Sequence, residues 1–241
     1  MGRFPHTREW QGFFMTDRKS TILQIIIDEH LKTGQPVASA VVAEKFGAEI
    51  SPATVRNDMA ELEAEGKIRQ PHTSAGRVPT AAAYEWLIAN LGPKKLSKTE
   101  AVTLSAALGE RQEADFKQTA KALAEISGAA VFWAFHRHNL YYTGISNLLA
   151  QPEFQEIQSI QHISLVIDQL DEIIDQIFPE IDFAPQLFSG NTCPFGNFTG
   201  AVLVKYKLGD NVGLFGLLGP IRMDYGMNLA LVKFIHEYLG T

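Results

Sequence analysis

Cysteine is nearly absent from this chain of 241 residues, because Cys193 is the only one. A lone cysteine excludes an internal disulfide framework, a cysteine zinc cage and a C-x-x-C redox pair, and it favours a reducing compartment. Long apolar runs are missing too, since the best stretches, 131–135 and 214–218, are far shorter than the roughly 20 residues that cross a bilayer. We therefore expect a cytoplasmic protein with no membrane partner.

An excess of positive charge is also lacking, and the net charge of −6 by itself argues against a nucleic-acid partner. The charges are unevenly distributed, however. Residues 1–98 carry 13 Lys and Arg against 11 Asp and Glu, whereas residues 99–241 carry 8 against 16. A polyanion is therefore expected to bind the N-terminal part. Hydrophobic residues make up 46% of the chain, which is typical of globular domains.

Three helices are expected in the N-terminal part. Apolar residues recur at three- and four-residue steps over 17–33 and, in a shorter stretch, over 39–46. Ser51 can cap a third helix, with Pro52 at the first helical position, where its missing N–H costs nothing. Gly66 ends this third helix.

A basic hairpin is expected after the third helix. Residues 67–70 alternate polar and apolar like a short strand, 71–76 are rich in turn formers, and 77–79 can return as a second strand. Three helices followed by a basic hairpin predict a winged helix-turn-helix. A fourth helix at 81–91 and a linker at 92–95 follow.

The second half is expected to be a mixed domain in which helices flank a mostly antiparallel sheet, which makes the fold α+β. The turns at 136–139 and 209–211 have the length and composition of β-hairpin connections. Helices are expected at 98–108, 113–126, 163–178 and 227–239, and strands at 130–135, 140–145, 200–208 and 212–218.

These patterns divide the chain into four parts. We expect residues 1–14 to be an N-terminal extension before Met15, and the sequence leaves open whether Met1 or Met15 is the natural start. Residues 15–92 are expected to form the winged helix-turn-helix, the candidate DNA-binding domain argued below, and 93–128 a linker and helices that can take part in dimerisation. Residues 129–241 form the mixed domain.

The third helix carries the candidates for reading DNA bases. Base reading needs side chains projected into the major groove from the first turns of a helix, between contacts that grip phosphates. Arginine can pair with guanine and asparagine with adenine through two hydrogen bonds each. Carboxylates at the C-terminal end of the helix would be repelled by phosphate. The helix is therefore expected to enter the groove with its N-terminal end. The base-reading candidates are Ser51, Thr54, Arg56 and Asn57.

The hairpin suits contacts with the DNA backbone or the minor groove. When the logarithm of the binding constant is plotted against the logarithm of the salt concentration, each phosphate that the hairpin neutralises is expected to make the slope steeper by about 0.9. The wing candidates are Lys67, Arg69, His72, Thr73, Ser74 and Arg77. Residue patterns alone leave two alternatives open, since three helices with a charged face also occur in ordinary solvated bundles and in modules that dock a protein partner.

One segment is much more specific than these patterns. SPATVRNDMAELEAEGKIRQPHTSAGRVPT, residues 51–80, closely resembles the signature of the heat-inducible transcription repressor family HrcA. Residues 18–47, RKSTILQIIIDEHLKTGQPVASAVVAEKFG, resemble the opening two helices of that family. YYTGISNLLAQPEF at 141–154 and GLLGPIRMDY at 216–225 extend the resemblance into the second half.

The resemblance implies a cytoplasmic bacterial repressor that binds an inverted-repeat operator, CIRCE, ahead of chaperone operons and is released on heat stress. It implies a winged helix that reads DNA and, at 129–241, a GAF-like domain that carries an inserted dimerisation subdomain. It also implies that the GroE chaperonin assists the active repressor, so that unfolded protein occupying the chaperonin relieves repression. Neither an enzymatic activity nor a cofactor is expected.

The chain departs from the family pattern at one place. The strand at 130–135 leads through only 136–139 into the strand before GISNLL, where the inserted subdomain would normally sit. We expect this subdomain to be reduced or absent. An inverted repeat still needs two DNA-reading domains related by a two-fold axis, so we expect a homodimer formed through the GAF-like domain or the helices of 98–126.

Other candidate sites in the second half are weaker. Gly213, Gly216 and Gly219 suggest a ligand site, but their spacing is not a dinucleotide fingerprint, and glycines in a strand more often allow close packing. A ligand-sensing or protein-docking regulator is therefore the alternative function. Arg222 and Asp224 are expected to anchor the last helix, the latter near its N-terminus.

No metal or catalytic residues are predicted. His136 and His138 lack a Cys or carboxylate partner, and an exposed turn is the better interpretation. The acidic residues of the helix at 163–178 are expected to form a solvated face, because no nucleophile motif accompanies them. They are Asp168, Asp171, Glu172 and Asp175.

Overall fold

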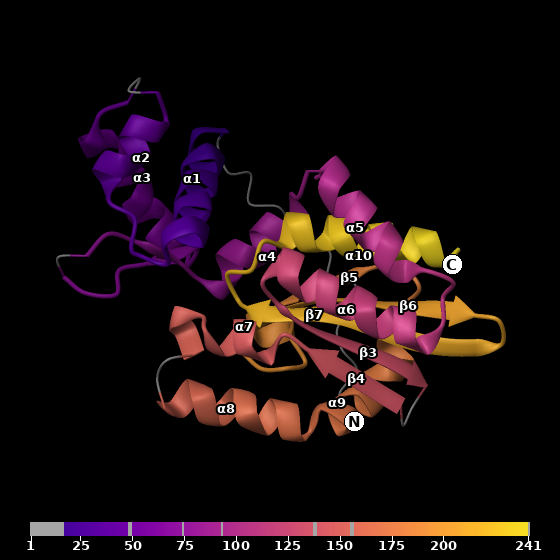
Figure 1. Ribbon diagram of the computed structural model, residues 1–241. Helices are drawn as coiled ribbons and strands as arrows, with labels where there is room; N and C mark the ends of the chain where they lie inside the picture. The colour runs from indigo at the N-terminus through magenta and orange to yellow at the C-terminus, as the bar shows by residue number, and fades with distance from the viewer. Residues whose placement is uncertain are drawn as a thin grey trace.

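The computed structural model describes residues 17–47, 50–73, 75–92, 94–136, 139–154 and 157–240. Figure 1 shows a small helical unit at the N-terminal side and a larger unit in which a sheet lies between two layers of helices. We call residues 17–80 the N-terminal unit and residues 94–240 the C-terminal unit. No helix in the described ranges is long and apolar enough to cross a membrane.

The N-terminal unit has the predicted order of three helices and a two-stranded hairpin. Its helices pack around a core that includes Ile22, Val42 and Leu62, all of them fully buried. Val37 forms an isolated antiparallel bridge with Arg77, beside the hairpin. The elements are α1 (Asp17–Thr33), α2 (Ser39–Lys45), α3 (Pro52–Ala64), β1 (Ile68–Arg69) and β2 (Val78–Pro79). The winged helix-turn-helix prediction is confirmed.

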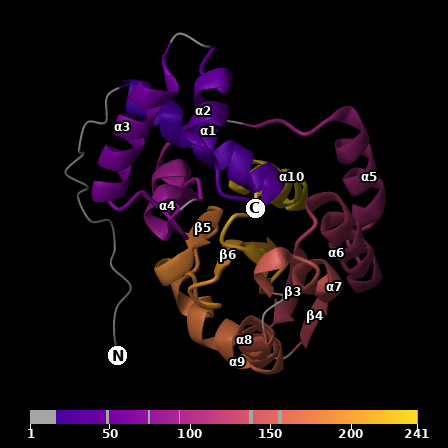
Figure 2. The same ribbon diagram turned by 90° about the vertical axis from the view of Figure 1, so that its left-hand side faces the viewer.

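Helix α4 (Ala81–Ala89) connects the two units. Figure 2 shows it between the N-terminal helices and strand β5 (Gln186–Ser189), with which it is in contact. Its Tyr84 is buried, and the ring centroid lies 6.3 Å from that of Tyr225 in the C-terminal unit. The N-terminal unit is therefore packed against the rest of the chain as well as tethered to it.

Five antiparallel strands form the sheet of the C-terminal unit, in the order β4-β3-β7-β6-β5. The four predicted strands are present, whereas β5 was not predicted from the sequence. The remaining strands are β3 (Ala130–His136), β4 (Asn139–Thr143), β6 (Thr199–Leu208) and β7 (Asn211–Pro220). His136, the last residue of β3, pairs with Asn139, the first residue of β4, so only two residues separate the two strands.

Strand residues alternate between two buried faces, each covered by helices. Val131 and Trp133 point into the core shared with α5 (Lys98–Leu108), α6 (Glu113–Ser127) and α10 (Tyr225–Leu239). Phe132 and Ala134 point into a second core. It is closed by α7 (Ile145–Leu149), α8 (Ile157–Asp168) and α9 (Leu170–Ile177), on the other side of the sheet in Figure 1. The α+β prediction is confirmed, and this layering is consistent with a GAF-like domain.

Three details differ from the sequence predictions. The single helix expected at 163–178 is two helices, α8 and α9, which meet at Gln169 with φ −105° and ψ 17°. The strand expected at 140–145 stops at Thr143, because Gly144 adopts a left-handed conformation with φ +76° and starts α7. Short 3₁₀ turns at Pro152–Phe154, Phe178–Glu180 and Gly190–Thr192 were also not expected.

Asp224 and Arg222 have different roles in the structure. The Asp224 carboxylate caps α10, since it accepts from the backbone N–H of Met227 at 3.0 Å, as expected. Arg222 does not anchor that helix. Its guanidinium turns toward the N-terminal unit and donates to the carbonyl of Leu31 at 3.2 Å. The expected extension at 1–14, Ser74 and His138 lie outside the described residues, as does the side chain of His136.

Candidate nucleic-acid interface

Helix α3 begins where the sequence indicates. The Ser51 hydroxyl accepts from the backbone N–H of Thr54 at 3.1 Å, and Pro52 occupies the first turn. Val55, Met59 and Leu62 then face the core. Since one face of the helix is buried in this way, the opposite face is presented to solvent.

The exposed face of α3 carries Ala53, Arg56, Asn57 and Ala60 at helical spacing. Arg56 and Asn57 lie in its middle, with the small side chain of an alanine on either side. Thr54 is half-buried, and its hydroxyl lies 3.0 Å from that of Ser51. Of the four base-reading candidates, Arg56 and Asn57 are thus free to reach outward, while Ser51 and Thr54 form the start of the helix.

Carboxylates at the C-terminal end of α3 are paired with cations. Lys19 of α1 contacts Glu61 at 2.6 Å and Glu65 at 3.0 Å. Hydrogen bonds to Glu61 and then to Glu65 raise the pKa of the Lys19 ammonium above its usual value. Arg77 of the wing contacts Glu63 at 2.9 Å. The predicted repulsion between this end of the helix and phosphate is therefore reduced by cations from elsewhere in the fold.

Helix α3 is also anchored to α1 through Asp58. This carboxylate is 3% exposed and accepts from Arg18 Nε at 2.9 Å and Nη2 at 2.8 Å. Such a bidentate contact fixes the orientation of the two side chains as well as the distance between them. Sequence reasoning missed Arg18, Lys19 and Asp58. Only the buried position of Asp58, on the face of Val55 and Leu62, offered a signal.

The wing candidates fall into two groups. Lys67 and Arg77 are engaged within the protein, because Lys67 Nζ donates to the carbonyl of Ala82 at 3.0 Å and Arg77 pairs with Glu63. Arg69, His72 and Thr73 are exposed. The first group holds the wing against α3 and α4, and the second is available to a partner.

The base of the wing depends on a close approach of two backbone segments. Arg77 and Val37 exchange backbone hydrogen bonds at 2.8 and 2.9 Å. At Gly76, a Cβ would lie 2.3 Å from the Val37 carbonyl oxygen, so a side chain does not fit there. Beyond it, the Gln70 amide donates to the carbonyls of Thr73 and Ala75, each at 3.0 Å, and shapes the turn.

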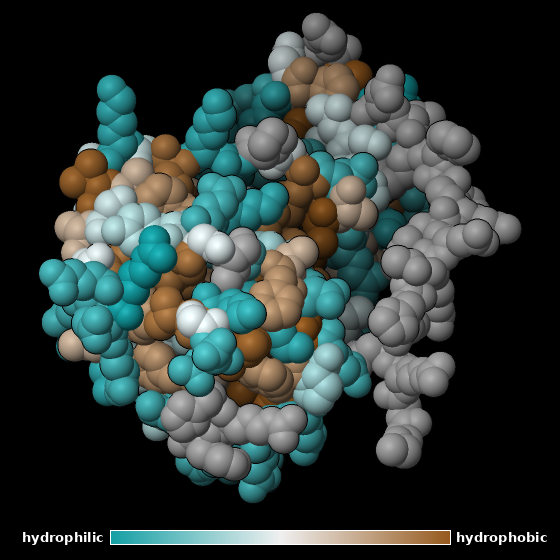
Figure 3. Space-filling view, turned by 90° about the vertical axis from the view of Figure 1, so that its right-hand side faces the viewer, coloured by the Kyte–Doolittle hydropathy of each residue, from teal (hydrophilic) through white to brown (hydrophobic). Residues whose placement is uncertain are grey.

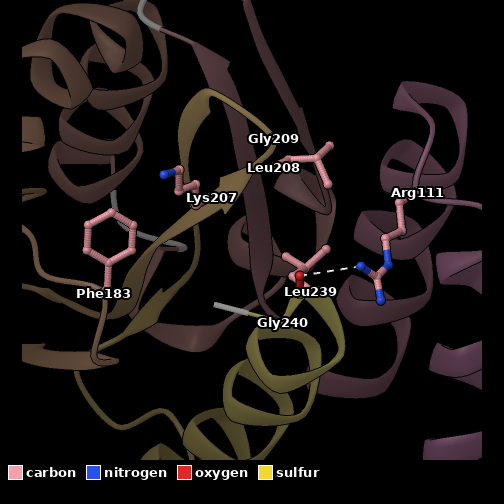
Figure 4. Close-up of a pocket in the computed structure, with 7 residues that line it drawn as sticks. All are labelled: Arg111, Phe183, Lys207, Leu208, Gly209, Leu239 and Gly240. Atoms are coloured by element: carbon pink, nitrogen blue, oxygen red, sulfur yellow. Dashed lines mark hydrogen bonds between the residues drawn. The ribbon is translucent and has the colours of Figure 1, made fainter.

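The C-terminal unit has a pocket of about 470 Å³ beside the end of α10. Figure 4 shows Arg111 at its side, donating to the Leu239 carbonyl, while Phe183 and Lys207 lie across from it. The Arg111 guanidinium also donates to the Tyr238 carbonyl at 2.7 Å, so it serves the end of the helix. Figure 3 shows this side of the molecule, where apolar and hydrophilic side chains are interspersed.

The glycines of β7 are packing positions. A Cβ at Gly213 would lie 2.4 Å from the Tyr206 ring, and one at Gly216 would lie 2.6 Å from Leu203 Cδ2. A Cβ at Gly219 would lie 3.2 Å from Met223 Cβ, which is a tight contact, and none of the three glycines lines the pocket near α10. These residues make room for side chains of the chain itself, as the packing interpretation predicts.

Two further predictions concern ionisable residues. Among the described residues, no three His, Cys, Asp or Glu gather in a way that could hold a metal ion. Asp168, Asp171 and Glu172 are exposed on α8 and α9, as expected for a solvated face, while Asp175 is half-buried.

Two family models match the chain. The model described as "Winged helix-turn-helix transcription repressor, HrcA DNA-binding" matches residues 14–91, and "HrcA protein C terminal domain" matches 74–227. The chain belongs to the HrcA family. HrcA is a family of transcription repressors, so the prediction that the chain is not an enzyme is confirmed, and its winged helix is a DNA-binding domain.

Curated relatives agree over nearly the whole chain. The heat-inducible transcription repressor HrcA of Carboxydothermus hydrogenoformans is 23% identical over 331 aligned positions, which span 93% of this chain and 97% of the relative. HrcA of Symbiobacterium thermophilum is 24% identical over 338 positions, again spanning 93% and 97%. Over 77 residues, 32% of this chain and 20% of the relative, HrcA of Chloroflexus aggregans reaches 48% identity.

The comparisons also bear on the expected loss of the inserted subdomain. An alignment of 331 positions exceeds the 241 residues of this chain, so the Carboxydothermus HrcA contains residues that have no counterpart here. Such residues are expected between β3 and β4, where only two residues separate the ends of the strands. A crystal structure described as that of a hypothetical protein shares the fold, with a TM-score of 0.75, 18% identity and coverage of 93% of this chain and 97% of that one.

Proposed function

We propose that this HrcA protein is a homodimeric repressor of chaperone operons that binds a CIRCE-type inverted repeat in the cytoplasm and is released on heat stress. The observation that carries the proposal is the exposed face of α3, where Arg56 and Asn57 stand between two alanines. The relatives that match nearly the whole chain are described as heat-inducible repressors, which supports the heat response. Dependence on the GroE chaperonin, which the family resemblance implies, is part of the same proposal.

In this proposal Arg56 and Asn57 read base edges, guanine and adenine respectively, through paired hydrogen bonds. Ser51 and Thr54 lie at the start of α3, where backbone N–H groups favour a phosphate. In the wing, Arg69, His72, Thr73 and Ser74 contact the sugar-phosphate backbone or the minor groove. Lys67 and Arg77 contribute to DNA binding by holding the wing in place, since both are engaged within the protein.

A dimer follows from the inverted repeat, because each half-site needs its own α3 helix. The C-terminal unit provides the contact in our proposal, through its GAF-like layers or the outer helices α5 and α6. Val102 of α5 is 69% exposed and would be covered by such a contact. Light scattering at micromolar concentration tests this part directly, and a monomer would contradict it.

The DNA-binding proposal is tested with the purified full chain and three duplexes: a CIRCE inverted repeat, its isolated half and a scrambled sequence. Arg56→Ala and Asn57→Ala are each expected to reduce discrimination between operator and scrambled duplex by about 1–3 kcal/mol. Fluorescence anisotropy titrations at physiological salt measure the affinities.

Arg69→Ala is the matched control, because an exposed wing cation that touches only phosphate is expected to weaken both duplexes equally. It is a better control than Arg77→Ala, which also breaks the contact with Glu63. Unchanged discrimination in both α3 variants would favour the alternative, in which the winged helix docks a protein partner.

A further inference from the structure

Three distant segments of the chain meet at Arg222. The guanidinium donates through Nε to the Glu153 carboxylate, through Nη2 to Gln151 Oε1 at 3.0 Å, and through Nη1 to the Leu31 carbonyl at 3.2 Å. Its side chain is only 12% exposed. Two of these segments, 148–154 and 219–225, carry the family resemblance in the C-terminal unit. The proposed reading of DNA bases by α3 does not involve either of them.

The contact at Leu31 satisfies the end of helix α1. Leu31 lies in the last turn, where carbonyls have no partner within the helix and a cation is favourable. Gly34 ends the helix with φ +66° and donates its N–H to the His30 carbonyl at 2.8 Å. A Cβ at Gly34 would lie 3.9 Å from Pro152 and 4.0 Å from the Arg222 guanidinium, so the helix end lies directly on the C-terminal unit.

The N-terminal end of helix α1 contacts α3, the helix proposed to face the DNA. Arg18 and Lys19, in its first turn, hold Asp58, Glu61 and Glu65 of α3. A helix of 17 residues is roughly 25 Å long. A tilt of about 5° at the Arg222 end therefore moves the α3 end by about 2 Å, a large part of the roughly 3.4 Å between base pairs.

We propose that Arg222 is the positioning residue that fixes α1 on the C-terminal unit and so sets the separation and angle of the two α3 helices of the dimer. This inference rests on the proposed function, since separation matters only where two half-sites are read together. Glu153 and Gln151 hold the guanidinium in place, and its Nη1 contact with Leu31 holds the N-terminal unit. Contacts through α4, such as that of Tyr84 with Tyr225, keep the units attached without it.

The test is Arg222→Ala in the full chain, with a CIRCE duplex, the same repeat with its spacer lengthened or shortened by two base pairs, and the isolated half-site. The unmodified chain is expected to prefer the natural spacer strongly. In Arg222→Ala this preference is expected to fall about tenfold, because loosely held units reach altered spacers more easily, while half-site affinity stays within about twofold. Glu153→Gln, which removes the charge that orients the guanidinium, is expected to give an intermediate loss.

Arg111→Ala is the matched control. Arg111 also binds carbonyls at a helix end, those of Tyr238 and Leu239, but it does so within the C-terminal unit. Arg111 lies between α5 and α6, so light scattering first checks that the variant is still a dimer; as a dimer, it is expected to leave the spacer preference unchanged. A spacer preference in Arg222→Ala equal to that of the unmodified chain would overturn the proposal, and so would equal losses on half-site and full repeat.

A second readout needs no DNA. Hydrogen exchange of the α1 amides is expected to accelerate at the C-terminal end of the helix in Arg222→Ala and Glu153→Gln, and to stay unchanged in Arg111→Ala.

If the unmodified chain binds no CIRCE duplex, the proposed function fails. The attachment of α1 by Arg222 is then still judged by exchange, and unaltered exchange rates would refute it.

Discussion

Arg56 and Arg77 have the same chemistry, but the fold gives them different partners. Arg56 stands on the exposed face of α3, whereas Arg77 is paired with Glu63 and joined to Val37 through its backbone. A basic residue in the wing is therefore not by itself a DNA contact. The nearest carboxylate decides whether the cation is available to phosphate, and in the wing this leaves Arg69 as the exposed arginine.

Gly76 provides a test at this scale. Gly76→Ala places a Cβ against the backbone of Val37 and Ala38, at 2.3 and 2.8 Å from the nearest atoms, so the wing must shift. We expect the free energy of unfolding to fall by about 1–3 kcal/mol and operator affinity to fall with it. Urea unfolding followed by circular dichroism measures the first effect.

Gly92→Ala is the control for this prediction, because nothing lies within 4 Å of a Cβ at that position. Equal unfolding midpoints for the two variants would show that the approach of the wing to Val37 is not tight.

At the scale of elements, α3 depends on α1. The buried face of α3 follows from its own apolar spacing, but its electrostatic character does not. Three glutamates at 61, 63 and 65 would make its C-terminal end acidic, and Lys19 and Arg77, from two other parts of the fold, offset most of this charge. A helix that is acidic in sequence thus becomes compatible with a polyanion in the folded protein.

Lys19→Ala tests this dependence. Without the ammonium, Glu61 and Glu65 repel phosphate, so affinity for operator and random duplex is expected to weaken about threefold to tenfold at low salt. Adding Glu61→Gln and Glu65→Gln to Lys19→Ala is expected to restore the affinity, as measured by anisotropy. Failure to restore it would mean that Lys19 itself binds phosphate.

Lys32→Ala is the control for this prediction, since Lys32 pairs with Glu29 at the other end of the same helix. A comparable loss of affinity in that variant would point to net charge rather than to the pairing with α3.

At the scale of the molecule, the two units share one apolar core. A single cluster of buried residues runs from Ile22 and Val55 through Tyr84 to Trp133 and Ile235, while a second cluster fills the opposite face of the sheet. The N-terminal unit is therefore not an independent domain on a flexible linker. Its position is fixed by apolar packing through α4 and by the polar junction at Arg222.

Stability is expected to decrease in mild acid. Burial lowers the pKa of His30 and of His236 below the ordinary value of 6.5, and the charge of nearby Arg222 adds to the effect at His30 while Glu153 opposes it. The unfolded chain then binds more protons than the folded one just below pH 6.5, so stability present above that pH is lost as the pH falls.

Urea unfolding at pH 7.5 and 5.5 measures this effect, and the midpoint is expected to be lower at pH 5.5. His30→Gln is expected to reduce the difference between the two midpoints. A difference that is as large in His30→Gln as in the unmodified chain would assign the effect to other groups.

The sequence predicted most elements because their signals are local. Ser51 and Pro52 start α3, and the spacing of Val55, Met59 and Leu62 gives its buried face. The misses are segments whose structure depends on distant partners. Strand β5 is four residues long and exists through its pairing with β6, and the break at Gln169 separates two helices that both pack on the second core.

By itself the sequence determined the local helices, caps and turns, the family, and the face of α3 that carries Arg56 and Asn57, since each depends on residues a few positions apart. Only the tertiary structure decided which cations remain for DNA and how the DNA-binding unit is held. Lys19 meets Glu65 across 46 positions and Arg222 meets Leu31 across 191. Ion pairs and helix-end contacts of this kind form only when packing brings the partners within a few ångströms, and no local pattern encodes that meeting.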